Sequence, residues 1–170
     1  MTAADGVPSA RSAQPATPEV PAPAVTVEAV AWDDAGATAL RVAQQAELAV
    51  QYGRGDLVAL TAPDDITAML VVRVDGVPSA CGALRDRGDG VGEVKRMFVR
   101  PEQRGRGLSR MVLTELERRA TELGWQRLIL ETGELQPAAI GLYRSAGYTP
   151  IPNYAPYEDE ADSWCFAKAL

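Results

Sequence analysis

The stretch Glu93–Leu123, EVKRMFVRPEQRGRGLSRMVLTELERRATEL, predicts a strand, then a turn rich in glycine and arginine, then a helix. The run that ends at Val99 is apolar and partly β-branched, which is typical of a strand, and Pro101 ends it because proline has no N–H to donate to a sheet. Beyond the turn, apolar side chains recur every three or four residues, as on the buried face of a helix: Leu108, Met111 or Val112, Leu116, Ala120 and Leu123. Gly124 is the expected end of this helix.

The turn itself, Arg104-Gly105-Arg106-Gly107, combines three features that attract an anion. The first backbone N–H groups of a helix have no partner within the helix and point outward. Glycine allows a ligand to approach the backbone closely, and arginine adds a fixed positive charge with forked donors. The turn therefore predicts a phosphate-bearing ligand; the alternative is an ordinary turn whose surface arginines bind nothing.

The composition is typical of a single globular domain, with 170 residues of which 46% are hydrophobic and 24% charged. The formal net charge of −6 argues against general affinity for nucleic acid. Positive charge is nevertheless concentrated around the turn, because residues 95–127 hold nine Lys or Arg and four Asp or Glu. An anion site in an otherwise acidic chain favours a specific anionic ligand over a polyanion surface.

The sequence argues against several kinds of catalytic and metal site, and against a membrane or secreted location. Histidine is absent, which excludes His-based triads and HExxH zinc sites. Cys81 and Cys165 form no CxxC pair, so we expect no metal and no disulfide but two buried free thiols. The acidic segment Glu158–Asp162 is expected to be a solvated loop. No apolar run is long enough to span a membrane and no secretory signal is visible, so we expect a cytoplasmic protein without a membrane partner.

Patterns in the rest of the chain predict an α/β fold. Residues 1–24, rich in Ala, Pro, Ser and Thr, predict a disordered tail, and residues 55–65 predict a loop. We expect strands at 25–31, 68–74, 77–84, 127–132, 148–151 and 163–170, with Asp75-Gly76 as a hairpin turn. Further helices are expected from Asp33 or Asp34 to Tyr52, with Leu40, Ala43, Ala46 and Val50 on the inner face, and from Pro137 to Ala146. The predicted order is β-α-β-β-β-α-β-α-β-β around a mixed sheet.

Three separated pieces of the sequence resemble one known family. The turn lacks the third glycine of the dinucleotide-binding motif, and no GxxxxGK[ST] occurs, which excludes NAD-type and P-loop sites. Arg104–Ser109 instead resembles the loop [RQ]-x-x-G-x-[GA], and Met97–Val99 with Pro101 resembles the strand before it. Gln136–Tyr148, QPAAIGLYRSAGY, resembles the signature NxxAxxLYxxxGF. In this order they resemble the GNAT superfamily of acyl-CoA-dependent N-acetyltransferases.

The resemblance implies an N-acetyltransferase domain over residues 25–170, with the GNAT acyl-CoA N-acyltransferase fold and acetyl-CoA as acyl donor. It implies that the coenzyme's pyrophosphate binds backbone N–H groups of Arg104, Gly105, Arg106, Gly107, Leu108, Ser109 and Arg110. It implies that the central strand splays from its neighbour, often at a bulge, and that Met97, Phe98 and Val99 pair with the pantetheine amides. Gln136 replaces the asparagine usual in the contact to the pantetheine arm, and Ser109 replaces glycine or alanine.

The resemblance also implies roles in proton transfer. Glu93 stands at the position of the general base in many relatives, and Glu131 matches a base position in another branch. The alternative for each is a strand carboxylate paired with Lys95 or Arg96. Tyr143 stands where many relatives have a general acid that protonates the leaving thiolate; the alternative is a core aromatic side chain.

The expected reaction is direct transfer of an acetyl group to a primary amine in a ternary complex, without a covalent intermediate. The acidic balance outside the turn favours a cationic small-molecule amine or amino acid as acceptor. Open alternatives are a non-catalytic acyl-CoA sensor, a protein N-terminal or lysine acetyltransferase, and transfer of a longer acyl group. Tyr154, Tyr157 and Trp164 line the acceptor pocket or belong to the core, and a homodimer is possible because relatives are often dimers.

Overall fold

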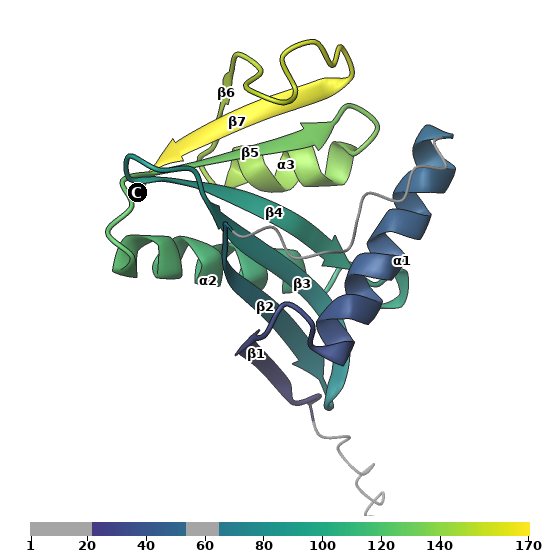
Figure 1. Cartoon of the computed structure of the whole chain (residues 1–170). Coiled ribbons are helices and arrows are strands. Elements are labelled where there is room, and N and C mark those ends of the chain that lie inside the picture. The colour runs from purple at the N-terminus through teal and green to yellow at the C-terminus, as the bar shows by residue number, and fades with distance from the viewer. Residues whose placement is uncertain (1–21, 54–64) are drawn as a thin grey trace, which may run out of the picture.

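The computed structural model describes residues 22–53 and 65–170, and these form one mixed sheet with helices on both faces (Figure 1). The strand order across the seven-stranded sheet is β1-β2-β3-β4-β5-β7-β6. The elements in chain order are β1 (Val25–Val30), α1 (Ala35–Tyr52), β2 (Ile66–Val74), β3 (Val77–Asp86), β4 (Val91–Val99), the 3₁₀ helix η1 (Pro101–Gln103), α2 (Leu108–Glu122), β5 (Arg127–Gly133), α3 (Pro137–Ser145), β6 (Thr149–Ile151) and β7 (Ser163–Ala169). The predicted order of strands and α-helices is confirmed, and η1 is an addition.

Two expected loop regions fall largely outside the described residues. Of the expected tail, residues 1–24, only the last three are described, and Ala24 is held at the sheet edge. Its N–H donates to Asp75 Oδ1 at 2.9 Å, and its carbonyl accepts from the Asp75 N–H at 2.8 Å. Of the loop expected at 55–65, only Asp65 is described. The domain boundary between residues 24 and 25 therefore stays a prediction.

Helix α1 begins and ends where its caps predict, but it buries a different face. Asp34 Oδ1 accepts the N–H of Ala37 at 2.9 Å, and Gly53 ends the helix in the left-handed conformation. Of the expected inner face, Leu40 is buried, Ala43 is half-buried, and Ala46 and Val50 are exposed. The buried residues are Ala37, Leu40, Arg41 and Gln45. The apolar pattern misled because two polar side chains, Arg41 and Gln45, take core positions, while Tyr52 at the C-terminal end of α1 lies against Gly133 of β5.

Each face of the sheet has its own apolar cluster. The face covered by α1, called the α1 face, holds Ala37, Leu40, Met69, Val71, Cys81, Ala83 and Phe98. The opposite face, called the α2 face, packs α2 and α3 against residues such as Leu70, Leu84, Leu128 and Phe166. The expected inner side of α2 is confirmed at Leu108, Val112, Leu116 and Ala120, whereas Met111 and Leu123 are exposed. Cys81 and Cys165 are free and buried, as expected.

The sheet opens between its two central strands. The parallel strands β4 and β5 pair only from Val91 with Arg127 to Val94 with Leu130. Beyond that point β4 has a bulge against β3, and Arg96 adopts a positive φ of 57°. The strands then diverge, as Figure 1 shows. The edge of β4 from Lys95 to Val99 is therefore left without a strand partner on the β5 side, which is the splay that the resemblance implies.

None of the described helices is both long and apolar enough to cross a bilayer.

Candidate active site

A pocket of about 400 Å³ lies at the splay, with α1 on one side and α3 on the other. It is lined by most of the residues predicted to bind the coenzyme: Met97, Phe98, Val99, Arg104, Gly105, Gly107, Leu108, Ser109 and Gln136. Tyr143 also lines it. Arg106 and Arg110 do not; their guanidinium groups bond to Gln103 and Ser145. The fold thus brings the strand, the turn and the second signature around one cavity.

The anion turn, defined as Arg104–Arg110, presents most of its backbone N–H groups to solvent or ligand. Gly105 and Gly107 adopt φ values of 76° and 77°, which only glycine adopts at low cost. The N–H groups of Gly105 to Arg110 donate no hydrogen bond to any residue in the described ranges. The N–H of Arg104 differs, because it donates to the carbonyl of Pro101 at 3.3 Å. We expected free backbone N–H groups from Arg104 to Arg110, but the N–H of Arg104 already has a partner, and the free groups begin at Gly105.

The side chain of Arg104 is held by a carboxylate from α1. Its Nη2 lies 2.7 and 2.6 Å from the two carboxylate oxygens of Glu47, and its Nε donates to the carbonyl of Val99 at 3.1 Å. Both partners of this ion pair are substantially exposed, and Glu47 lines the pocket. An anion entering the pocket would compete with Glu47 for the guanidinium.

The free edge of β4 and the ring of Tyr143 define the inner part of the pocket. Gln44 Nε2, from α1, donates to the carbonyl of Met97 at 2.9 Å. Tyr143 is 4% exposed, and its ring lies 5.9 Å from that of Tyr148 and 6.5 Å from that of Phe166. Burial raises the pKa of Tyr143, and the nearby charge of Glu131 raises it further. The phenol of Tyr143 is therefore neutral and carries its proton.

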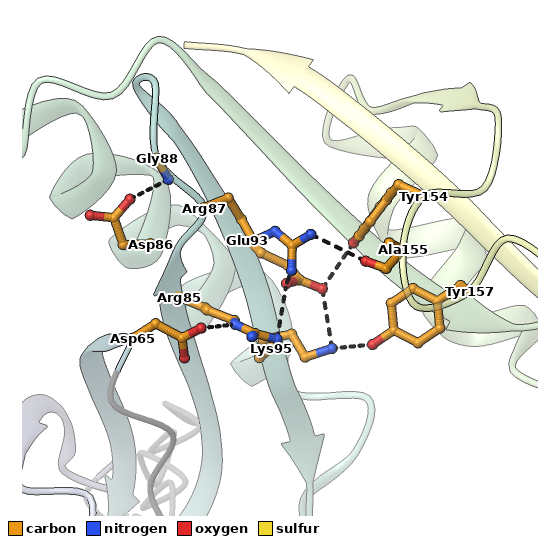
Figure 2. Close-up of polar contacts among 10 residues, drawn as sticks. All are labelled: Asp65, Arg85, Asp86, Arg87, Gly88, Glu93, Lys95, Tyr154, Ala155 and Tyr157. Carbon is orange, nitrogen blue, oxygen red and sulfur yellow. Dashed lines mark hydrogen bonds and ion pairs between the residues drawn. The ribbon is translucent and has the colours of Figure 1, made fainter.

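Glu93 occupies a different place, buried on the α1 face beneath the connection between β6 and β7. Its Oε1 accepts from the Tyr154 hydroxyl at 2.9 Å and from Lys95 Nζ at 3.2 Å. Its Oε2 lies 3.6 Å from Arg87 and 3.9 Å from Arg85 but accepts no hydrogen bond from a described residue. Figure 2 shows these contacts. The Glu93 cluster is defined as Arg85, Arg87, Glu93, Lys95, Tyr154 and Tyr157.

The cluster keeps Lys95 charged. Burial by itself lowers the pKa of Lys95, but Glu93 and Tyr157, which both hydrogen-bond to it, raise that pKa by more. Burial also raises the pKa of Tyr154, and the neighbouring charge of Glu93 raises it further. The alternative to a catalytic role for Glu93 was a strand carboxylate paired with Lys95 or Arg96, and the ion pair with Lys95 is present. Arg96, the other candidate partner, makes no ion pair with a residue of the ranges that the structure describes.

Glu131 differs from Glu93 in accessibility and environment. It lies half-buried on β5, and its Oε1 accepts from the Ser163 hydroxyl at 2.8 Å. Burial raises its pKa, while the Ser163 bond and the charge of Lys95 oppose that rise only in part. Neither glutamate lines the pocket, but the charge of Glu131 acts on Tyr143. Of the three predicted catalytic residues, Tyr143 therefore lines the pocket, and Glu93 and Glu131 do not.

Sequence reasoning missed several polar side chains at both places. Arg85 lies opposite Glu93 in the β3–β4 pairing, a register that the turn between these strands could have suggested. Gln44 and Glu47 carried no signal, because polar residues on a helix are ordinarily solvent-facing. Trp164 does not join Tyr154 and Tyr157; it is 40% exposed and lies against the guanidinium of Arg144 at 5.6 Å.

Comparison with known proteins places this geometry in a family. Residues 31–148 match the model of the acetyltransferase (GNAT) family. A curated IAA acetyltransferase from Azospirillum brasilense is 40% identical over 116 residues, which make up 68% of this chain and 74% of that protein. A Klebsiella pneumoniae structure described as an acyl-CoA N-acyltransferase is 32% identical, with a TM-score of 0.75 over 86% of this chain and 97% of its own.

A more distant structure shares the fold alone. PaiA N-acetyltransferase from Thermoplasma acidophilum, solved in complex with coenzyme A, is 13% identical, with a TM-score of 0.66 over 86% of this chain and 99% of its own. The sequence signatures, the splayed sheet and the matches over most of the chain agree. The chain belongs to the acetyltransferase (GNAT) family and is an acyltransferase enzyme.

Proposed function

We propose that this enzyme transfers the acetyl group of acetyl-CoA to the primary amine of a small molecule, by direct attack in a ternary complex. The observation that carries the proposal is that one pocket joins Gly105, Gly107, Leu108 and Ser109 of the anion turn to the free edge of β4 and to Tyr143. Such a path fits a ligand that has a diphosphate at one end, amides in the middle and a thioester at the far end.

The binding half of the proposal assigns the coenzyme to backbone groups. The diphosphate accepts from the amides of Gly105 to Arg110, where the N-terminus of α2 adds its positive dipole. Arg104 turns from Glu47 toward the diphosphate. The pantetheine amides pair with the β4 edge at Met97–Val99, where Gln44 now bonds the Met97 carbonyl. Gln136 lies at the start of α3 and contacts the pantetheine arm.

The incoming amine must lose a proton before it attacks, since a lysine-type amine has a pKa of about 10.4. In the proposal Glu131 accepts this proton, because it is half-buried rather than enclosed and because burial raises its pKa toward that of the amine. Glu93 instead holds Lys95 and Tyr154 in place, since its Oε1 is occupied by both. The family resemblance allows either glutamate as the general base, with Glu93 at the position used in many relatives; the proposal assigns this role to Glu131.

The bond changes follow from these positions. The amine nitrogen attacks the thioester carbonyl carbon, and a backbone N–H of the β4 edge stabilises the oxyanion. The carbon–sulfur bond breaks, and the Tyr143 hydroxyl gives its proton to the leaving thiolate. The nitrogen then releases its second proton to solvent, and Tyr143 regains a proton from solvent. Burial raises the pKa of Tyr143, which weakens it as an acid, but the same burial disfavours a free thiolate. The products are the N-acetyl amine and coenzyme A.

The test is release of free thiol from acetyl-CoA in the presence of a panel of primary amines. Turnover with at least one small amine, and no burst of acetyl-enzyme in rapid-quench experiments, is the expected result. A protein that binds acetyl-CoA by calorimetry but releases nothing with any amine would be a sensor, and the proposal would be wrong. Turnover only with peptides would assign the enzyme to protein acetylation instead.

Tyr143→Phe tests the acid within the same assay. It keeps the ring packed against Tyr148 and Phe166, so we expect kcat to fall about a hundredfold while acetyl-CoA affinity stays the same. Tyr148→Phe, which removes a hydroxyl from the neighbouring buried ring, is the matched control and should leave kcat within a few-fold of wild type. An unchanged kcat in Tyr143→Phe would remove the assigned role.

A further inference from the structure

The bulge in β4 turns two consecutive cationic side chains toward the same face. In a regular strand, Lys95 and Arg96 would point to opposite faces. At the bulge Arg96 takes a φ of 57°, and Met97 packs toward Val112 on the α2 face. The carbonyl of Arg96 accepts from the thiol of Cys81, which is buried on the α1 face, at 3.3 Å, and the charges of Tyr157, the partner of Lys95, and of Cys81 act on the pKa of Arg96. Arg96 therefore lies on the α1 face, two residues beyond the last β4–β5 pair.

Arg96 has no counter-ion in the described part of the chain. Its half-buried guanidinium forms no hydrogen bond or ion pair with any residue of the ranges 22–53 and 65–170. Burial lowers its pKa, although Tyr157 and Cys81 oppose this. A half-buried cation without a partner carries a desolvation cost, which an anionic ligand would offset. A guanidinium is also the group that binds a carboxylate with two parallel hydrogen bonds.

A second buried cation, Arg41, adds to the positive electrostatic potential around Arg96. Arg41, on α1, is 2% exposed, and its guanidinium lies 3.9 Å above the Trp32 ring. It donates to the Trp32 carbonyl at 2.7 Å and to the Thr38 hydroxyl at 3.2 Å, but its Nε has no hydrogen-bond partner among the described residues. The positive charges of Arg41 and Arg96 repel each other. The charge of Arg41 also lowers the pKa of Cys81, although burial raises that pKa by more.

No carboxylate in the described ranges forms an ion pair with Arg96 or Arg41, although the charge of Asp33 raises the pKa of Arg41. Glu93 is already shared by Arg85, Arg87 and Lys95, and Asp65 pairs with Arg85. Glu131, held by Ser163, remains for the amine. An acceptor with several positive charges would therefore meet a predominantly cationic face, although the chain as a whole has a net charge of −6. The acidic balance outside the turn led us to expect a cationic small-molecule amine or an amino acid, and the charges on this face favour the amino acid.

We propose that the acceptor amine also carries a carboxylate, and that Arg96 binds this carboxylate while Glu131 faces the amine. The acceptor class is therefore an amino acid or a similar amino carboxylate. This inference rests on the proposed acetyl transfer and adds the group that selects the acceptor. Arg96 is the specificity-determining residue, and Arg41 strengthens the positive potential from behind it.

The experiment compares amino carboxylates with their carboxamides as acceptors in the thiol-release assay, with rates referred to the concentration of unprotonated amine. We expect kcat/KM to favour the carboxylate by about tenfold to a hundredfold, the range for hydrogen bonds to charged groups. Arg96→Asn removes the charge, and asparagine tolerates a positive φ. It should bring the ratio close to one by raising KM for the carboxylate alone. Arg96→Lys should retain part of the preference.

The controls separate this inference from the proposed function. Arg118→Gln removes an exposed arginine that pairs with Glu115 and Glu122 on α2, and it should leave the ratio as in the wild-type enzyme. Equal or faster turnover of the carboxamide by the wild-type enzyme, or an unchanged ratio in Arg96→Asn, would overturn the acceptor inference and leave acetyl transfer standing. Absence of turnover with every amine would overturn both.

Discussion

The anion turn and the Glu93 cluster lie toward opposite ends of β4, and they are built from different parts of the chain. The turn is one contiguous, exposed segment that presents backbone N–H groups, with glycine supplying the conformation. The cluster consists of side chains from three separate segments, gathered around a carboxylate that is fully buried. The difference shows that the anion turn depends on local conformation and the Glu93 cluster on tertiary contacts.

The largest effect should come from the turn. Gly107→Val places a β-branched side chain at a φ of 77° and covers the free N–H groups at the start of α2. Loss of two charge-assisted hydrogen bonds of about 2 kcal/mol each weakens acetyl-CoA binding on the order of a thousandfold. Isothermal titration calorimetry measures the change in Kd.

Gly88→Val is the matched control for this substitution. Gly88 also has a positive φ, 80°, and an added Cβ would meet nothing within 4 Å at either glycine. Both variants should therefore lose similar stability through backbone strain, and only Gly107→Val should lose the coenzyme. Equal acetyl-CoA affinity in the two variants would contradict the assignment of the turn.

The next largest effect should come from the cluster, and it should be an effect on stability. Glu93→Gln leaves Arg85, Arg87 and Lys95 without the buried carboxylate that they share. Removing one partner of a buried ion pair typically costs about 3 kcal/mol, so the midpoint of urea unfolding should fall clearly. Acetyl-CoA affinity should change little, since Glu93 does not line the pocket. An unchanged midpoint would show that the cluster does not hold the fold together.

The same contrast explains which features could be predicted from the sequence. The turn, its helix and the hairpin at Asp75-Gly76 follow from glycine positions and side-chain periodicity, which act over a few residues. The bulge at Arg96 had no such local signal, because a positive φ at arginine is set by the neighbouring strand and not by its own preference; only the family resemblance implied a bulge in this strand. Tyr154 and Tyr157 reach Glu93 and Lys95 through a loop without periodicity. Contacts of that kind need the tertiary structure.

A smaller effect tests the one ion pair that links α1 to the turn. Glu47→Gln frees Arg104 and removes a negative charge from the pocket wall. Exposed ion pairs are worth well under about 1 kcal/mol, so stability should hardly change. Acetyl-CoA should bind about threefold more tightly, and the gain should shrink as salt screens the charges. Weaker binding in Glu47→Gln would mean that Glu47 positions Arg104 for the coenzyme rather than competing with it.

The smallest effect should be that of Glu131→Gln on stability, and its sign should be opposite to that of Glu93→Gln. Because burial raises its pKa, the folded protein retains this proton at a pH where the unfolded chain has lost it. The stability that the protonated group contributes is complete below the unfolded pKa of about 4.3 and is lost as the pH rises through the higher folded value. Glu131→Gln should therefore unfold at a higher urea concentration than wild type at neutral pH, and this advantage should shrink in acid. The two Glu→Gln changes then shift stability at neutral pH in opposite directions, and a shift of the same sign would mean that both carboxylates serve the fold alike.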